Sequence, residues 1–525
     1  MLKEGRCLKD KHRLLLILTA VLLSILVQSG TLGNVDTTRR LQVSRWIWAN
    51  EPPVAIGDEK DFGILGRDGK YHAWYGLGQS LVMIPLDIIG TTAIHASQTL
   101  SNIDDKLGGK LREAFVAYCL ASLLSVGAIL VAERLLKALG FESSQSRLGA
   151  LALILGTTFL HYLQDLQENN LLLLLSLTGL MLHHQWLLSD KDTHLIGGFV
   201  ILGFGPMTRL TASFDLLAVV AWTCCCLYQL RSCQANWKGR LGRYLLSFSM
   251  TSLICVGLDR AYHYYRFGLY SGTYIHLMGE RMRNLHKDLP STFPFSNPFE
   301  NGFWGAIITP EKSLFLFDPL VILTIYLLIK HWRAIDIQIR TLLIVGAAWL
   351  MGYIVFYASY YDWGGDSAWG DRFITTPVQI TALFAVPIYL RWRRPLNLTR
   401  ERPIVLLFIL VTVWIQISSV FFSYNLEIIQ LQHAPTKIIV LLRQINIAAW
   451  LTGNFERWKL SASVPLSYLT PGFAVFWPAR NFGPRAALWL KVVWGMGLIT
   501  NFAMLLWVVR VNSKLISAKT HEVAE

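Results

Sequence analysis

The sequence predicts an all-α polytopic membrane protein with about twelve transmembrane helices and long outer loops that carry interfacial helices. Of its 525 residues, 53% are apolar, and the mean hydropathy is +0.41. Charged residues make up 16% of the chain, against about 25% in an ordinary soluble domain. The apolar residues fall in long, nearly uncharged runs, and a run of about 20 such residues is what a helix needs to cross a hydrocarbon core. These runs exclude an array of soluble domains.

Twelve apolar runs are the expected spans. In chain order they are 14–29, 113–133, 148–163, 170–188, 194–207, 210–229, 244–262, 313–329, 341–360, 373–390, 403–423 and 486–509. The fifth run is short and ends at Gly205-Pro206, so the fifth and sixth helices are expected to form a hairpin. A further apolar run, 81–94, is expected to be an interfacial helix because Asp87 interrupts it.

The positive charges predict the orientation. Lys and Arg number 48 against 34 Asp and Glu, which gives a net charge of +14. Twelve spans would place seven segments, 85 residues in all, on one side of the membrane, and these segments hold 24 of the 48 cations. They are 1–13, 134–147, 189–193, 230–243, 330–340, 391–402 and 510–525. Because positive residues concentrate in cytoplasmic loops, we expect a multi-pass protein of the inner (plasma) membrane with both termini in the cytoplasm. The basic charge is thus explained without nucleic acid as a partner.

The other side of the membrane receives the long loops. They are 30–112, 263–312 and 424–485, with shorter connections at 164–169 and 361–372. The chain accordingly divides into a transmembrane core, an outer region and a last helix with a cytoplasmic tail: 1–423, 424–485 and 486–525. Since the outer loops are rich in Trp, Tyr, Gly, Pro and acids rather than in low-complexity sequence, we expect a ligand to bind on this side.

Two outer carboxylates are catalytic candidates. Asp36 follows the first span by a few residues, and a carboxylate near the apolar boundary can have a raised pKa and act as a general base. The alternative is an N-cap for a helix over Thr37 to Trp48. Asp165 lies at the mouth of the third and fourth helices, either as a second cleft carboxylate or as an acid that caps a helix start.

The segment 66–79 combines four spaced glycines with four aromatic rings. Such a pattern is typical either of an aromatic belt at the membrane interface or of a platform for a sugar, to which Tyr75 would contribute. Lys70 and His72 in this segment are candidates to contact a phosphate.

Two arginines lie at outer edges of the membrane, where cations are disfavoured. Arg209 follows Pro206 at a helix tip, and Asp215, one turn into the next helix, is its expected partner. Arg372 ends the loop 361–372, which holds two tryptophans, three glycines and three aspartates. Because Arg binds phosphate in a bidentate manner, we expect the two arginines to converge on one anion.

The same loop offers candidate substrate contacts. Its glycines allow the backbone to approach a ligand closely, and the candidate contacts are Trp363, Asp366 and Trp369. The alternative is a surface turn that its tryptophans anchor in the membrane belt.

Taken together, several motifs resemble bacterial membrane glycosyltransferases of the GT-C superfamily. They are the acidic first outer loop, GRDGKYHAWYGLGQSLVMIPL, GFGPMTRLTASFD, NPFENGFWGAIITPEKSLFLFDPL and YYDWGGDSAWGDRF. More narrowly, the chain resembles the branch of dolichyl-phosphate-mannose protein mannosyltransferases and aminoarabinose transferases, in order over nearly its whole length. The resemblance implies a GT-C-like fold and an inverting transfer of a sugar from a polyprenyl phosphate to a glycan, lipid or protein acceptor at the outer face.

The resemblance also implies roles for residues. It makes Asp36 the base and Asp165 the acid at the start of the fourth span, and it places Arg209 and Arg372 near the donor phosphate. Family members often carry two adjacent acids at the base, whereas this chain has Val35-Asp36-Thr37. The soluble C-terminal domain of the family is also missing, and only 424–485 stands in its place.

The chemistry of such a transfer needs a carboxylate for the hydroxyl proton and cations for the departing phosphate. No cofactor is expected, and no His/Cys cluster indicates a metal. A transporter of lipid-linked sugars would show paired repeats and broken midplane helices, which this sequence lacks. A non-catalytic assembly partner of the same fold stays open.

Overall fold

The computed structural model describes residues 2–232, 236–366, 368–392, 398–431, 433–461, 464–465, 468–476 and 479–522. Within these residues the protein is mostly helical, in agreement with an all-α polytopic membrane protein. One antiparallel hairpin joins β1 (Gly63–Leu65) to β2 (Tyr71–Ala73), with Ile64 opposite His72.

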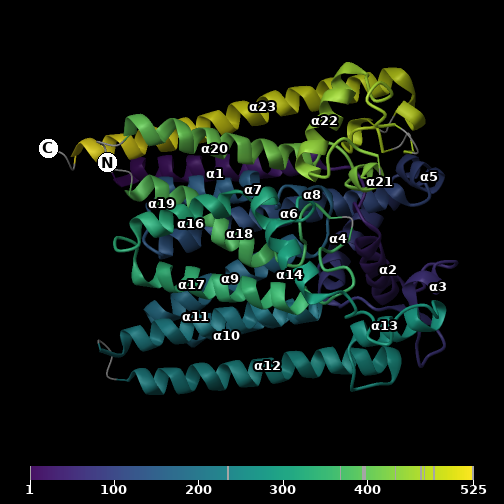
Figure 1. The fold of residues 1–525 in the computed structure, drawn as a ribbon, viewed down its shortest axis with the longest axis horizontal. Helices are drawn as coiled ribbons and strands as arrows, with labels where there is room; N and C mark the ends of the chain where they lie inside the picture. The colour runs from purple at the N-terminus through teal and green to yellow at the C-terminus, as the bar shows by residue number, and fades with distance from the viewer. Residues whose placement is uncertain are drawn as a thin grey trace.

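The helices of the bundle run side by side along the horizontal axis of Figure 1, with α12 at one edge and α20 and α23 at the other. In chain order they are α1 (Leu2–Val27), α6 (Lys110–Ala138), α7 (Ser143–Gly156), α9 (Asn169–Ser189), α10 (Asp192–Thr208), α11 (Ser213–Gln229), α12 (Trp237–Phe267), α16 (Leu320–His331), α17 (Ile337–Tyr357), α18 (Thr375–Leu383), α19 (Ala385–Trp392), α20 (Leu398–Ser419) and α23 (Ala479–Glu522). Helix α9 packs against α6, α10 and α11 at the centre of the bundle.

The shorter elements lie mostly at one end of the bundle. They are α2 (Val35–Ala49), α3 (Glu59–Phe62), α4 (Gly78–His95), α5 (Gln98–Lys106), α8 (His161–Gln164), η1 (Leu210–Ala212), η2 (Leu230–Ser232), α13 (Tyr274–Leu285), α14 (Phe299–Ile308), α15 (Leu314–Phe317), α21 (Asn425–Gln430), α22 (Ile439–Thr452) and η4 (Ala474–Phe476). In Figure 1 both chain termini lie at the left end, whereas α2, α3, α5, α13, α21 and α22 gather at the right end. The three long loops therefore meet at the end opposite the termini.

Seven helices in the described part of the chain are long and apolar enough to cross a membrane, or eight if the pair α4 and α5, bent by 112°, forms one broken span. The seven are α6, α9, α11 with its flanking turns, α12, α17, α20 and α23. Other expected spans fall on shorter helices, such as α7 with 14 residues and α16 with 12. An apolar run in the sequence also includes turn residues that lie outside the helix. The predicted number of about twelve spans therefore exceeds the number of long helices.

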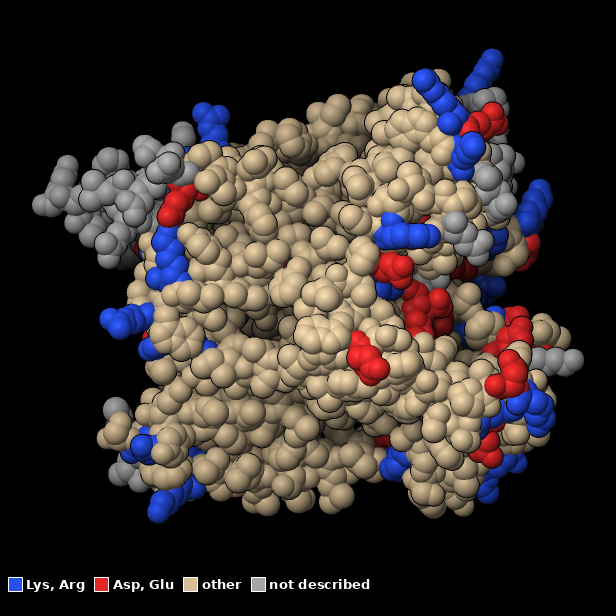
Figure 2. All heavy atoms as spheres, viewed as in Figure 1, with Lys and Arg blue, Asp and Glu red and all other residues tan. Residues whose placement is uncertain are grey.

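The outer surface of the bundle is apolar. Figure 2 shows a broad belt with few charged side chains between two ends that carry most of the Lys, Arg, Asp and Glu visible in this view. Helix α12 exposes Leu253 (69%) and α23 exposes Ile499 (72%). An apolar surface of this kind is favourable in contact with lipid and unfavourable in contact with water. The belt therefore indicates that the protein is embedded in a membrane.

The helix predicted over 81–94 is present as part of α4, which contains Asp87 and continues to His95. The Asp87 carboxylate is buried, and it accepts hydrogen bonds from Arg45 and from the indole of Trp48 on α2, both at 3.0 Å. Because α2 supplies these partners, the acid is satisfied inside the packed interface and the helix need not end there.

The outer region from 424 onwards contains a buried ion pair whose arginine also bonds to the end of α20. Arg443 on α22 donates to both carboxylate oxygens of Glu427 on α21, at 2.7 and 2.6 Å, and both side chains are fully buried. Arg443 also donates to the carbonyl of Ser419 at the end of α20. Helix α23 begins at Ala479 rather than at 486, so its first turns belong to the stretch expected to be loop.

Candidate functional site

The start of α2 is docked on the connection between α8 and α9. The N–H of Leu166 donates to the carbonyl of Leu32 at 3.1 Å, and the hydroxyl of Thr37 donates to the carbonyl of Leu166 at 2.9 Å. Gly33 has φ +85°, and a Cβ at this position would lie 2.6 Å from the Cα of Asp165. Only glycine therefore permits this approach, which brings Asp36 and Asp165 to one place.

Asn34, and not Asp36, is the N-cap of α2. Its side-chain oxygen accepts the backbone N–H of Thr37 at 2.8 Å, and its amide nitrogen donates to Asp165. The expected alternative role of Asp36 as a cap is therefore wrong. Asp36 lies in the first turn of α2, where its carboxylate is free to face other groups.

The Asp36 carboxylate accepts hydrogen bonds from two residues that are distant from it in sequence. The hydroxyl of Tyr75 donates to Oδ1 at 2.6 Å, and Nη1 of Arg372 donates to Oδ2 at 3.2 Å. Burial and the nearby charge of Asp36 raise the pKa of Tyr75 well above its usual value, so the phenol stays a donor. Tyr75, expected as part of a sugar platform, thus orients the candidate base.

Asp165 is almost completely buried beside a histidine. In addition to the amide of Asn34, it accepts from Nε2 of Gln167 at 3.3 Å, and its Oδ2 lies 3.8 Å from Nε2 of His161. Burial raises the pKa of Asp165 to about 7, against the effect of the Asn34 hydrogen bond. This carboxyl group therefore exchanges protons near neutral pH.

Glu168 joins two arginines in the interior. Its oxygens lie 2.8 Å from Nη2 of Arg40 and 3.4 Å from Nη1 of Arg209. Burial would raise the pKa of Glu168, but the two guanidinium charges outweigh it and lower the pKa to about 2. The expected pairing of Arg209 with Asp215 is wrong, because Asp215 accepts from the side chains of α17 and α9 instead: Trp349, Tyr353 and Ser176.

Arg209 and Arg372 approach each other at one aromatic ring. The guanidinium carbons lie 5.8 and 5.3 Å from the centroid of Phe373. With Arg40 they form a cluster of three guanidinium groups around two carboxyl groups, Asp36 and Glu168. Among the described residues, several buried nitrogens of this cluster have no hydrogen-bond acceptor: Nε and Nη1 of Arg40, Nε and Nη2 of Arg209, and Nε of Arg372.

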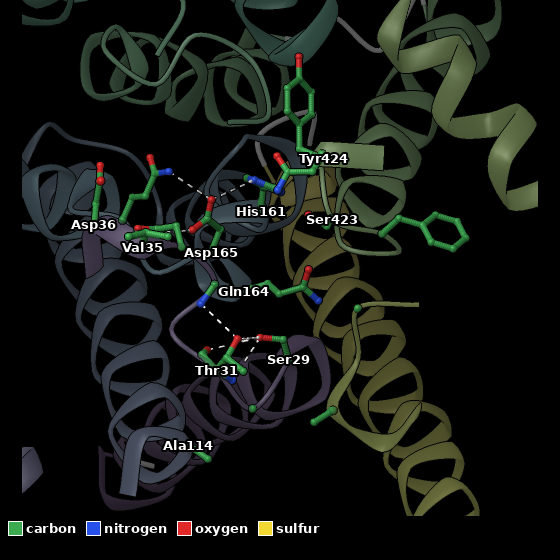
Figure 3. A pocket seen from close by; sticks show the side chains of 18 of the residues that line it. Ser29, Thr31, Val35, Asp36, Ala114, His161, Gln164, Asp165, Ser423 and Tyr424 are labelled. Atoms are coloured by element: carbon green, nitrogen blue, oxygen red, sulfur yellow. Dashed lines mark hydrogen bonds and ion pairs between the residues drawn. The ribbon is translucent and has the colours of Figure 1, made fainter. Parts of the chain in front are cut away.

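A pocket of about 900 Å³ opens beside this cluster. It is lined by charged and polar groups on one side, and these include Asp36, Asp165, Asp366, Arg372 and His161. Figure 3 shows Asp36, Asp165 and His161 in a row, with Tyr424 beyond them and Ser29 and Thr31 on the opposite side. Apolar lining comes from Leu107 before α6, from Leu111, Ala114 and Tyr118 in the first turns of α6, and from Phe422 after the end of α20.

Six candidates do not line the pocket. Two of them contact residues of the charged cluster: Tyr75 donates to Asp36, and Arg209 pairs with Glu168. The other four lie elsewhere. His72 is buried in the hairpin, where its Nε2 lies 3.0 Å from Oδ1 of Asp68, and Lys70 is exposed at the hairpin turn. Trp369 is buried in a packed cluster against the ring of Phe317. Trp363 packs on the backbone of α14. Three of these side chains, His72, Trp363 and Trp369, thus pack against other residues of the chain, and Lys70 is open to solvent.

Sequence reasoning missed the two residues that complete the charged cluster. Glu168 stands three positions after Asp165, and Arg40 stands one helical turn after Asp36. An i, i+4 spacing from a candidate base was the available signal for Arg40. The spacing could not show that the two side chains meet, because Arg40 and Glu168 lie on elements joined only by the fold.

No family model and no curated protein matches this sequence. The chemistry of the pocket must therefore be argued from its residues. No group of three or more His, Cys, Asp or Glu side chains in the described residues is arranged to hold a metal ion. The site offers two carboxylates with different environments and a cationic cluster with unpaired donors.

Proposed function

We propose that the protein is a GT-C-like membrane glycosyltransferase that moves a sugar from a polyprenyl phosphate to an acceptor in the pocket. About twelve spans would place this pocket at the outer face of the plasma membrane and both termini in the cytoplasm. The observation that carries the proposal is the contact between Asp36 and Arg372 at the pocket wall. It brings a carboxylate for the acceptor proton next to a cation for the phosphate.

The reaction is a single displacement. The acceptor oxygen attacks the anomeric carbon from the face opposite the phosphate, and the bond between that carbon and the phosphate oxygen breaks. The electron pair leaves with the polyprenyl phosphate, the hydroxyl proton passes to Asp36, and the configuration at the anomeric carbon is inverted. Such a step needs a positioned base and preorganised positive charge at the leaving group.

The charges of the site suit an anionic donor. Three guanidinium groups face two carboxyl groups, and some of the buried nitrogens of Arg40, Arg209 and Arg372 have no acceptor among the described residues. Buried N–H groups without acceptors are costly, and phosphate oxygens would satisfy them. Arg372 can contact Asp36 through Nη1 and a phosphate through Nε, because Nε has no acceptor of its own.

The carbon skeleton of the donor also has a matching surface. An apolar strip of the pocket wall lies just before α6 and along its first turns, and it consists of Leu107, Leu111, Ala114 and Tyr118. A polyprenyl chain gains free energy in proportion to the apolar area that it buries there. The lipid would therefore lie along α6, with its phosphate towards Arg372.

The first test is Asp36→Asn. We expect expression and thermal stability close to normal, since Asn34 and not Asp36 caps α2, and a loss of turnover of at least about 10² because the base is removed. Transfer would be measured with purified protein and a radiolabelled sugar on decaprenyl phosphate, and cell-envelope glycans would be compared with and without the protein.

The matched control is Asp58→Asn. Asp58 lies 2.6 Å from Arg39 in the same outer loop, and it does not line the pocket. This variant should keep full activity. Unchanged glycans in cells that carry a folded Asp36→Asn protein would contradict the proposal and would favour a non-catalytic assembly partner.

A further inference from the structure

Lys312 is a half-buried lysine in the NPFENGFWGAIITPEKSLFLFDPL motif, between α14 and α15, and the proposed reaction does not use it. Its ammonium group donates to three backbone carbonyls of the loop 361–372. The acceptors are the carbonyl oxygens of Asp366 and Ala368, both at 2.7 Å, and of Gly370 at 3.1 Å. These bonds engage all three N–H groups of the ammonium, so none is left for a substrate.

The loop depends on a cation at this position. It turns through Gly365 (φ +77°) and Gly370 (φ +75°) and directs three carbonyl oxygens at one point. Converging carbonyl dipoles repel one another unless a positive charge lies between them, as in the carbonyl sites that hold ions. Lys312 supplies that charge, and the ring of Tyr424 lies 4.7 Å from its Nζ.

The shape of the loop controls Arg372. The carbonyl of Gly370 is two residues before Arg372, and the loop folds back so closely that a Cβ on Gly365 would lie 2.3 Å from Cγ of Arg372. Asn169 at the start of α9 donates to the carbonyl of Arg372. The loop therefore holds the arginine from both sides, while its guanidinium group reaches Asp36.

We propose that Lys312 is a positioning residue whose ammonium group holds the loop 361–372 in the shape that sets Arg372 against Asp36 and the donor phosphate. The inference rests on the proposed function for its ligand only. The shape of the loop does not depend on a ligand. It is therefore tested separately from the binding of the donor.

The first experiment measures amide hydrogen exchange in a peptide covering 361–374 of the detergent-solubilised protein. In Lys312→Ala we expect exchange at least about 10-fold faster than in the natural protein, because the loop opens locally. Ethylammonium chloride should slow it again by filling the vacated space with an N–H donor. Tetramethylammonium, which has no N–H group, should not.

Lys330→Ala is the matched control. Lys330 is an exposed lysine at the end of α16, where its Nζ lies 2.6 Å from Oε2 of Glu401, and its loss should leave the peptide unchanged. A second variant, Gly364→Ala, keeps the ammonium group but places a Cβ 2.9 Å from Cγ of Lys312. Gly364→Ala should also speed amide exchange in the peptide. It replaces Lys312→Ala as the test variant if Lys312→Ala does not fold.

The second experiment measures binding of decaprenyl phosphate. We expect Lys312→Ala to bind this probe at least about 10-fold more weakly, and ethylammonium to restore the affinity. Unchanged exchange in both loop variants would overturn the inference, and so would faster exchange with unchanged binding. If the natural protein does not bind decaprenyl phosphate, the proposed function fails, while exchange and its rescue by ethylammonium still decide whether Lys312 holds the loop.

Discussion

Asp165 links the stability of the protein to pH. Burial raises its pKa from 3.8 to about 7. An acid whose pKa is raised on folding stabilises the fold in its protonated form, so this contribution is complete below about pH 4 and is lost as the pH rises through about 7. We therefore expect the melting temperature to fall between about pH 4 and pH 7, and Asp165→Asn to reduce that fall.

Thermal unfolding in detergent at several pH values measures this effect. Asp58→Asn, at a half-exposed carboxylate that pairs with Arg39, should leave the pH dependence as it is. A pH profile that is the same in Asp165→Asn and the natural protein would show that Asp165 does not titrate in this range.

At the residue scale, the sequence identified positions better than partners. Asp36, Asp165 and Arg372 were chosen because each stands at a junction of helix and loop, and all three line the pocket. The partner of Arg209 was predicted wrongly as Asp215, whereas it is Glu168. Closeness in sequence favoured the acid six residues away, but the choice of partner depends on how α2, α9 and η1 meet in space.

At the scale of elements, the docking of α2 on the connection before α9 depends on Gly33. Gly33→Ala would meet the backbone of Asp165 and would adopt φ +85°. Both effects are unfavourable for a residue with a Cβ. We expect a lower melting temperature and a loss of sugar transfer, because α2 carries Asp36 away from Arg372.

Gly57→Ala separates the two effects. Gly57 has φ +98°, but a Cβ there would meet nothing within 4 Å. This control has the cost of a left-handed backbone but not the collision with a neighbouring residue. It should therefore reduce stability less than Gly33→Ala does, and it should leave sugar transfer intact. Equal losses in both variants would mean that the contact at Asp165 does not matter.

Elements were predicted well where the apolar run was long, and less well where tertiary contacts extend or shorten a helix. Helix α17 at Ile337–Tyr357 lies close to the expected span 341–360. Helix α4 continues past Asp87 because Arg45 and Trp48 neutralise and bond that acid. No local pattern contains this information, since α2 and α4 are separated by the β-hairpin.

At the scale of the whole molecule, the sidedness follows from how charge and loops are divided. The long loops meet at the end opposite the termini in Figure 1, and the belt between the two ends in Figure 2 carries few charges in this view. Moving a charged end across a hydrocarbon core is costly, so one orientation should hold for every molecule. The pocket then faces a single compartment.

The orientation can be measured with single cysteines in a background without the natural ones. Lys70, Asp288 and Glu456 are exposed in the three long loops, and Lys191 is exposed in the short connection between α9 and α10. We expect an impermeant maleimide added to intact cells to label cysteines at the first three positions, and to label position 191 only after permeabilisation, because cation-rich segments stay in the cytoplasm. Labelling of position 191 in intact cells would reverse the orientation. The donor would then have to be used on the cytoplasmic side, where Asp36 and Arg372 would meet a different set of acceptors.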